Sequence, residues 1–143
     1  MNYEGLGVLV GRVVGDEETP RAIRGAVGKR IVRAELYDDG DIDELRLWFT
    51  DDTAIRIFDD GQSCCEYRYM TTDDDPTAFV GALLENVRVQ EGPDVEDERG
   101  NAHEVEFLIV DTSLGSFTLE THNEHNGYYG GFLVVARPLV EVV

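Results

Sequence analysis

Two short stretches of this 143-residue chain carry most of the side chains that could do chemistry. The first, DDGQSCCEYRYM from Asp59 to Met70, holds two adjacent thiols with a glutamate and an arginine. The second, HNEHNGYYGGF from His122 to Phe132, gathers two histidines, two asparagines and two tyrosines around a glycine. Thiolates and imidazoles bind metals or serve as nucleophile and base, whereas aromatic rings and amides recognise planar ligands.

The spacing of the cysteines and histidines does not favour metal or nucleophilic chemistry. A structural zinc site takes four ligands, commonly Cys-x2-Cys with His-x3-5-His, but here the thiols are adjacent and the histidines are His122-x2-His125, with His103 apart. Neighbouring residues of a strand point to opposite faces, so the two thiols diverge and a disulfide between them would be strained. No Gly-rich phosphate loop, serine elbow or HExxH helix is present. We expect no cofactor, no metal and no catalytic residue, and keep a Cys/His-dependent or metal-dependent hydrolase as an alternative.

The histidine-rich stretch is typical of a tight hairpin that could also hold a ligand. Asn126-Gly127 predicts a turn with positive φ, and Gly130 with Gly131 removes side-chain bulk after the tyrosine pair. In one interpretation, the glycines only let a tyrosine ring lie flat against a neighbouring strand. In the other, rings, amides and imidazoles form a platform on which a planar base stacks. A phosphate on that ligand would need a cation, and Arg68 is the best local candidate because its guanidinium suits phosphate oxygens.

The chain is strongly acidic, with 30 acidic against 12 basic residues, eleven of which are arginine. Such an excess repels polyanions at long range, which argues against a surface that coats DNA or RNA. Three interpretations of the charge remain open. It reflects solubility or genomic background, or it mimics nucleic acid toward a DNA-binding partner. In the third, the protein binds a small ligand through a few arginines concentrated in one pocket, with the carboxylates outside.

The elements that position these residues are mostly strands. Clusters of Asp and Gly recur at short intervals and predict turns, and between them apolar residues alternate with period two. The predicted inward-facing sets are Val32, Ala34 and Leu36; Leu45, Leu47 and Phe49; Ile55 and Ile57; Val105, Phe107 and Ile109; and Phe117, Leu119 and Thr121. Further strands are predicted over Gly5–Val14, 61–70 and Tyr128–Ala136.

One segment has helical spacing. Asp75 stands where an N-cap is expected, Pro76 takes the first helical position, and Phe79 with Leu83 recurs at the helical period. The aspartates before it lack the ligand pattern of an EF-hand calcium loop. We therefore predict a mostly β protein, an antiparallel β barrel or sandwich of about seven to nine strands with one short helix near 76–85.

The length suits a single domain over residues 1–143. No apolar run approaches the roughly 20 residues that cross a bilayer, and the first positions do not have the order of a signal peptide. We expect a cytoplasmic protein with no membrane partner. The apolar C-terminal strand would be an adhesive free edge unless covered, so we also expect a homo-oligomer; pairing with the N-terminal strand within one chain is the alternative.

Taken together, DDGQSCCEYRYM and HNEHNGYYGGF, separated by one predicted helix and two strands, resemble a family of small proteins from tailed phages and prophages known as a domain of unknown function. The resemblance covers about Gly28 to Ala136. More distantly, a strand-borne Cys-Cys followed by Asn-Gly-Tyr-Tyr is similar to the Thoeris anti-defence proteins. Those are phage-encoded oligomeric sponges that capture cyclic ADP-ribose-type immune signals without cleaving them.

This resemblance implies a non-enzymatic protein that binds a small nucleotide-like ligand and no polymeric nucleic acid, in the host cytoplasm if phage-encoded. It implies that Asn126 contacts the adenine and that Phe117 or Tyr128 stacks on it. The complete set of predicted ligand-binding residues is Cys64, Glu66, Arg68, Tyr69, Phe117, His122, Asn123, His125, Asn126, Tyr128 and Tyr129. The alternatives are an acidic nucleic-acid mimic or protein-interaction inhibitor, and the hydrolase.

Overall fold

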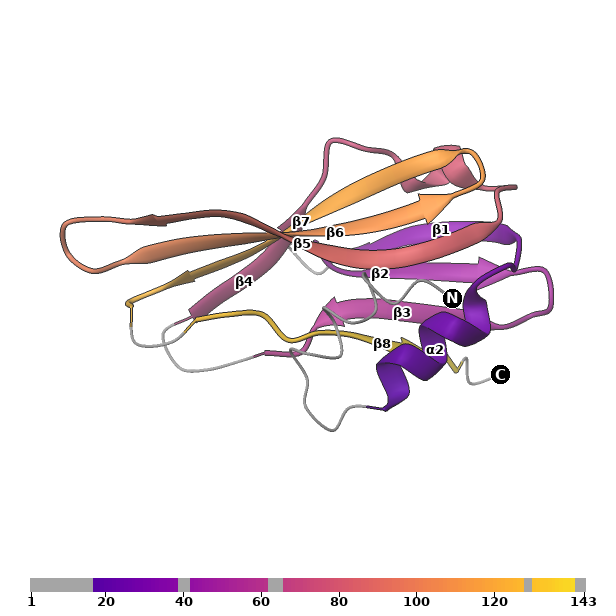
Figure 1. The fold of residues 1–143 in the computed structure, drawn as a ribbon, viewed down its shortest axis with the longest axis horizontal. Coiled ribbons are helices and arrows are strands. Elements are labelled where there is room, and N and C mark those ends of the chain that lie inside the picture. Colours follow the sequence, from indigo (N-terminus) through magenta and orange to yellow (C-terminus); the bar gives the residue numbers. More distant parts are fainter. Residues whose placement is uncertain (1–16, 39–41, 62–65, 128–129, 141–143) are drawn as a thin grey trace.

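The computed structural model describes residues 17–38, 42–61, 66–127 and 130–140, which form one α-helix, one 3₁₀ turn and eight strands (Figure 1). In chain order these elements are α2 (Glu18–Ala26), β1 (Ile31–Asp38), β2 (Ile42–Phe49), β3 (Ala54–Asp59), β4 (Glu66–Thr71), η1 (Pro76–Phe79), β5 (Leu84–Glu96), β6 (Ala102–Thr112), β7 (Gly115–His125) and β8 (Val134–Pro138). The predicted strand Gly5–Val14 lies outside the described residues, as do Tyr128 and Tyr129. The last strand, predicted from Tyr128, begins only at Val134, where pairing with β3 starts.

The strands form one antiparallel sheet that curls into a half-barrel (Figure 1). Its order is β5-β6-β7-β4-β2-β3-β8, and β1 also pairs with β2. Among the described residues, the register of β4 with β2 consists of the single pair Ile42 and Met70. The sheet therefore consists of a β5-β6-β7-β4 half and a β1-β2-β3-β8 half, and the predicted fold class, mostly β and antiparallel, is confirmed.

The core lies inside the curl, between the two halves. The predicted alternation holds in β2, where Leu45, Leu47 and Phe49 are all buried while Arg46 and Trp48 are not. Because one face of each strand must leave water, this period-two pattern fixes which way the sheet curls. The largest fully buried apolar side chains are Phe49, Phe117, Ile23, Ile31, Leu45, Leu47, Ile57, Leu84, Leu108 and Leu119.

Strand β6 presents the opposite face from the one predicted. Leu108 and Val110 point into the core, paired with Leu119 and Phe117 of β7, whereas the predicted inward set begins at Val105, which is only partly buried. The sequence from Phe107 to Val110 is apolar on both faces, so the period cannot choose between them and the register with β7 decides. As a result Glu106 lies inside, fully buried, opposite Thr121.

Strand β1 differs from the prediction at one position. Val32 is exposed, although Ala34 and Leu36 face inward as expected. The register with β2 shifts between Ile31 and Arg33, so Ile31 takes the buried place in front of the bulge.

The predicted helix near 76–85 is only a short 3₁₀ turn. Asp75 does cap it, accepting hydrogen bonds from the backbone N–H and the hydroxyl of Thr77, and Pro76 opens it. The turn ends at Phe79 because Gly81 adopts a φ of +98°, outside the helical region, and Leu84 then begins β5. The strand replaces the helix because the residues from Leu84 onward pair with β6.

The α-helix, α2, was not predicted, and it covers the open seam of the half-barrel (Figure 1). At its start, the backbone N–H of Ala136 in the edge strand β8 donates to Thr19 Oγ1 at 3.2 Å. Just after its end, Gly28 N–H donates to the carbonyl of Leu84 in β5 at 2.7 Å. The free edge of β8, from which we predicted oligomers, therefore faces α2, and the oligomeric state stays a prediction. Neither of the helices described here is long and apolar enough to cross a bilayer.

If α2 closes the core, truncating its buried side chain Ile23 should greatly lower the free energy of unfolding. Ile23 is fully buried in the core cluster, so Ile23→Ala should lower the free energy of unfolding by about 2–5 kcal/mol through lost burial and a residual cavity. Urea denaturation followed by circular dichroism measures this. The control is Arg21→Ala in the same helix, an exposed residue, for which a change within about 0.5 kcal/mol is expected. Equal effects from the two variants would contradict the role of α2.

Candidate functional site

The two chemically rich stretches meet in an arm of the sheet that extends beyond the other half (Figure 1). We define the arm as residues 66–69 of β4, 91–106 of the β5–β6 hairpin, 121–125 of β7 and the following Asn126. Strand β4 pairs with the end of β7, so that Arg68 lies opposite Asn123 and Tyr69 opposite His122. The sheet pleat sends alternate side chains to opposite faces. Glu66, Arg68, Asn123 and His125 thus come together on the inner face, and Tyr69 comes together with His122 on the outer face.

On the inner face, Arg68 is enclosed by carboxylates. Its guanidinium donates to Asp59 at 2.8 and 3.0 Å and to Glu66 at 2.9 and 3.0 Å, and its side chain is only 10% exposed. Burial acts to lower the pKa of Arg68, but the bonds to Asp59 and Glu66 outweigh it, so this pKa lies above its ordinary value. A Cβ at Gly61 would lie 2.3 Å from the guanidinium, so the glycine makes room for it. Arg68 is thus an internal counter-ion with two carboxylates already bound.

Side chains of the same face also hold the segment that follows β7. Asn123 Nδ2 donates to the carbonyl of Gly131 at 3.1 Å, and Gly131 N–H donates to the Glu104 carboxylate at 3.2 Å. Gly127 N–H donates to His125 Nδ1 at 3.0 Å, which leaves the hydrogen on Nε2 to donate to Glu104 at 2.5 Å. Residues 130–133 are therefore held across the arm by a buried polar network.

The predicted hairpin is absent from the described residues, where β7 pairs with β4 and β6 while β8 pairs with β3, but glycines after β7 do make room for neighbouring groups. Gly127 has a φ of +90°, as the predicted turn requires, and a Cβ there would lie 2.5 Å from the Gly100 carbonyl oxygen. A Cβ at Gly130 would lie 2.4 Å from Glu104 Oε1 and 3.2 Å from His125 Nε2. The missing bulk at Gly130 thus accommodates a carboxylate and an imidazole.

Of the remaining predicted site residues, one lies in the core, one at the end of the arm and three outside the described residues. Phe117 is fully buried in the core, with its ring centroid 4.9 Å from that of Phe79, so it belongs to the packing of the half-barrel. Asn126 is exposed at the turn. Cys64, Tyr128 and Tyr129 lie outside the described residues.

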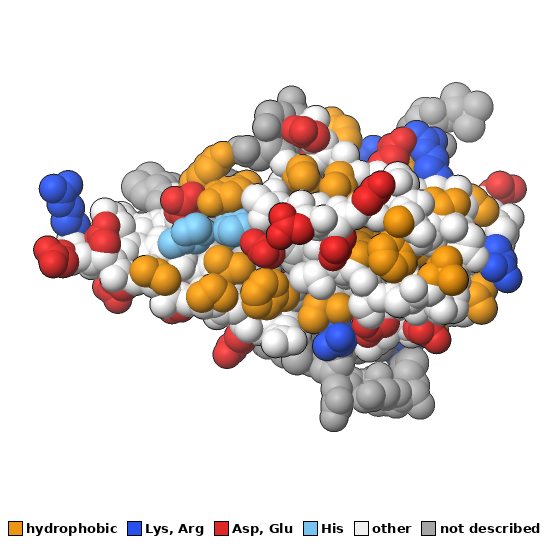
Figure 2. Space-filling view, turned by 90° about the horizontal axis from the view of Figure 1, so that it is seen from above, with side chains coloured by type: hydrophobic (Ala, Val, Ile, Leu, Met, Phe, Trp, Pro, Cys, Tyr) orange, Lys and Arg blue, Asp and Glu red, His pale blue; other side chains and the backbone are white. Residues whose placement is uncertain are grey.

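On the outer face, four rings form a continuous strip across β4, β7 and β6. Tyr67 and Tyr69 have centroids 4.8 Å apart, Tyr69 stacks on His122 at 4.6 Å with planes 4° apart, and His122 lies 5.1 Å from His103. We call this set, Tyr67, Tyr69, His122 and His103, the ring strip. Figure 2 shows histidine side chains at the surface among hydrophobic side chains, with carboxylates nearby. Tyr67, at one end of the strip, is 49% exposed.

Hydrogen bonds define which ring nitrogens of His103 and His122 donate and which accept. Because a carboxylate can only accept, Thr71 Oγ1 donates to Glu120 at 3.2 Å. The Thr71 oxygen therefore accepts from His122 Nε2 at 2.8 Å. Neutral His122 then accepts at Nδ1 from His103 Nε2, 2.9 Å away. Burial and the charge of His103 lower the pKa of His122, with a partial offset from Glu120 and Glu124. Neutral His122 is the form that fits the strip.

A recess of about 520 Å³ adjoins the strip at His103. It lies between the end of β7 and the turn of the β5–β6 hairpin and carries amides and carboxylates. Its lining residues are Val95, Asp97, Asn101, Ala102, His103, Glu124, His125 and Asn126. Across the described ranges, no three His, Cys, Asp or Glu side chains gather in a way that could hold a metal ion.

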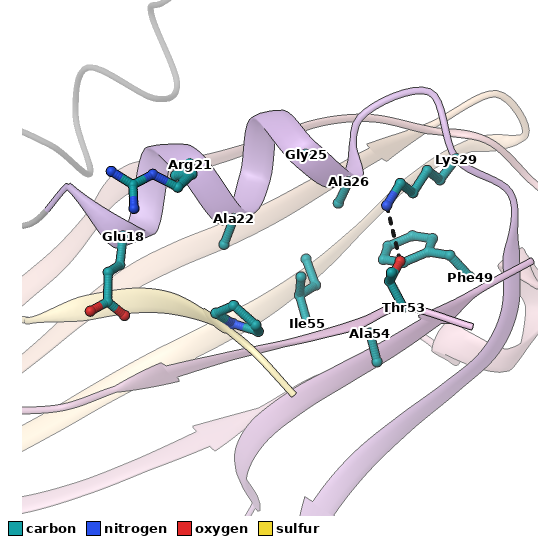
Figure 3. Close-up of a pocket in the computed structure, with 11 residues that line it drawn as sticks. Glu18, Arg21, Ala22, Gly25, Ala26, Lys29, Phe49, Thr53, Ala54 and Ile55 are labelled. Atoms are coloured by element: carbon teal, nitrogen blue, oxygen red, sulfur yellow. Dashed lines mark hydrogen bonds between the residues drawn. The ribbon is translucent and has the colours of Figure 1, made fainter. Parts of the chain in front are cut away.

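A second hollow, which the sequence did not reveal, lies between α2 and the sheet (Figure 3). This groove of about 360 Å³ has apolar walls that include Ala22, Phe49 and Ile55. At its rim, Lys29 Nζ donates to Thr53 at 3.0 Å (Figure 3) and lies 2.7 Å from Asp51. The hydrogen bonds that Asp51 accepts from Lys29 and Thr53 lower its pKa to about 2. The helix was missed because its apolar residues are few and small, although Thr19-Pro20 is a helix-start signal.

Removing the buried cation should be far more costly than removing an exposed one. Arg68→Met leaves Asp59 and Glu66 buried without a counter-charge and should destabilise the fold by about 3–5 kcal/mol. The matched control is Arg88→Met, whose partner Asp111 is more exposed, with an expected loss of about 1 kcal/mol or less. Urea denaturation at pH 7 compares them. Similar losses would show that the Arg68 cluster is not a buried ion network.

The histidine order predicts a pH dependence. Because the pKa of His122 is lowered on folding, the stability that neutral His122 provides is present above its ordinary pKa of 6.5 and is lost as the pH falls below it. Ring NMR of the three histidines should place the pKa of His122 below 6.5, and His103→Gln should raise it by removing a neighbouring positive charge. An unchanged pKa of His122 in that variant would contradict the coupling.

Comparison with known proteins gives one match. A model of a domain of unknown function, DUF7448, matches residues 24–135, close to the span expected from the two motifs. No curated protein and no solved structure matches the chain. The matched span includes the strands of the arm and all four rings of the strip. Since the match covers most of its length, this chain belongs to the DUF7448 family.

Proposed function

We propose that the protein is a non-enzymatic binding protein that holds a small planar ligand of the nucleobase type on the outer face of the arm. The observation that supports this most is the ring strip, which ends in the half-exposed ring of Tyr67. A ring fixed on a strand offers its face to a ligand without further ordering, and stacking of a base on such a ring contributes about 1–3 kcal/mol.

The recess beside His103 supplies groups that could read the edge of the stacked ligand. Asn101 and Asn126 each offer an amide, and Asp97 and Glu124 accept hydrogen bonds. Because two carboxylates line it, the recess favours a neutral or cationic ring over an anionic one. Arg68 is committed to Asp59 and Glu66, so a phosphate on the ligand would use Arg99, in the turn between Asp97 and Asn101.

The most specific form of this proposal is a phage-encoded sponge that sequesters a nucleotide-type immune signal, as the sequence resemblance implies. Such a role needs retention of the ligand and no turnover. A platform of stacked rings on a sheet can retain a ligand through stacking. Such contacts bind the ground state and a transition state equally well, so they hold the ligand without accelerating a reaction.

Adenosine, AMP and cyclic ADP-ribose, titrated by isothermal calorimetry, test the proposal. At least one should bind, and Tyr67→Ala should weaken it about fivefold or more, as expected for the loss of one stacking ring. Leu114→Ala is the control because Leu114, 65% exposed, lies in the turn between β6 and β7, away from the strip. Ligand released by heating the complex should have its original mass.

Other outcomes would each contradict the proposal in a distinct way. Gly25→Leu fills the groove beside α2, where a side chain at Gly25 meets no atom, so a loss of binding in that variant would place the ligand there instead. A chemically altered ligand would indicate a hydrolase. Dimers that dissociate on Tyr67→Ala in native mass spectrometry, with no ligand bound, would show that the strip is a self-association surface. Capture of a DNA-binding protein by wild type and Tyr67→Ala alike, again without ligand, would favour the acidic mimic.

A further inference from the structure

Three arginines stand side by side on the outer face of the other half of the sheet. Arg46 in β2 is the direct cross-strand partner of Arg56 in β3, and Arg56 is the partner of Arg137 in β8. Like charges directly opposite each other destabilise a sheet. Such a row is unexpected in a chain with 12 basic and 30 acidic residues, so another interaction must offset the repulsion between these arginines.

A single buried carboxylate holds two of these arginines. Glu44, 5% exposed, accepts from Arg56 Nε and NH2 at 3.2 and 2.7 Å with one oxygen, and from Arg46 Nε with the other. Two guanidinium groups on one carboxylate leave an excess of positive charge. Arg137 turns toward α2, where it lies 3.2 Å from Glu18 and donates to Thr19.

Aromatic rings fix the orientation of the two arginines that share Glu44. The Arg46 guanidinium lies over Tyr37 at 4.3 Å and the Arg56 guanidinium over Phe58 at 4.1 Å. Their side chains are 26% and 37% exposed, unlike that of Arg68. Arg46 bonds through Nε alone, so within the part of the chain that the structure describes its two terminal amino groups have no acceptor. These N–H groups are positioned before any ligand arrives.

We propose that this row binds the phosphate group of a small molecule, with Arg46 and Arg56 donating to its oxygens. The planar fork of arginine matches phosphate oxygens, and the local excess of positive charge complements an anion. The net charge of the whole chain, −18, repels extended polyanions at long range, so a compact anion is the ligand that the row suits. The row lies on β2, β3 and β8, whereas the ring strip lies on β4, β6 and β7, and this inference does not depend on the proposed function.

Inorganic phosphate and pyrophosphate, titrated at low ionic strength and followed by ³¹P NMR and calorimetry, test the inference. Both should bind saturably, and Arg56→Gln and Arg46→Gln should each weaken binding about tenfold or more by removing a charge-assisted donor. Glu44→Gln should tighten binding, because it removes the competing negative charge while its amide oxygen still accepts from Arg56. Arg88→Gln, an exposed arginine paired with Asp111, is the control and should leave binding unchanged.

Three results would overturn the inference: no saturable binding by the wild type, equal losses in Arg88→Gln and the row variants, or weaker binding by folded Glu44→Gln. The last result would mean that the row is only a structural ion cluster. Circular dichroism verifies that each variant is folded, and the two single arginine variants substitute for each other if one fails to fold. Adenosine binding, measured in parallel, should be unaffected by Arg56→Gln, so the failure of one proposal is distinguishable from the failure of the other.

Discussion

The structure depends on one constraint, which is that the sheet formed by the described residues curls around an apolar interior but does not close on itself. Between β8 and β5 no strand pairing completes the barrel in the described residues, and the interior would meet water there without a cover. Helix α2 supplies that cover with Ile23 and Ala26, and its flanking residues satisfy backbone groups of both neighbouring strands. A short helix can do so because it brings its own backbone hydrogen bonds and needs only one apolar stripe.

Beyond the reach of this core, the arm has a different interior. There the inward-facing positions of β4, β6 and β7 are occupied by Glu66, Arg68, Glu104, Asn123 and His125, which bond to one another and to the Gly131 backbone. Buried charges persist only when paired, so these residues are committed to structure and the outer face carries the accessible chemistry. The consequence for function is that the arginine nearest the predicted site is the one least able to meet a ligand. Arg99 in the turn of the β5–β6 hairpin, and Arg46 and Arg56 on the other half of the sheet, are more exposed.

Much of the fold could be predicted from the sequence because its signals are local. Alternation identified β2 and β3, the Asp and Gly clusters marked the turns, and Asp75-Pro76 marked η1. The predictions that were wrong concern features decided by contacts with residues distant in the chain. The face of β6 depends on its register with β7, and the length of η1 depends on the competing strand pairing of Leu84 and the residues after it.

The candidate site was predictable to the same degree. The adjacency of the two motifs is present as the β4–β7 pairing, and the division of Glu66 and Arg68 from Tyr69 follows from the strand period. The sequence could not show that Asp59, nine residues before Arg68, would neutralise it, because that contact requires the chain to reverse between β3 and β4. Nor could it show that Arg46, Arg56 and Arg137 would align, since two separate registers, β2 with β3 and β3 with β8, bring them together.

Three ion pairs join residues two apart on one strand: Arg33 with Glu35, Arg46 with Glu44, and Arg68 with Glu66. Both members of such a pair project from the same side of the same strand, so a slip of that strand against its neighbour moves them together and leaves their attraction intact. The energy of such an ion pair is therefore the same in the native and in the slipped alignment. The discrimination between the native alignment and its slipped competitors must therefore come from the inward apolar residues, the bulges and the ion pairs that join different strands, such as Arg56 with Glu44 and Arg68 with Asp59.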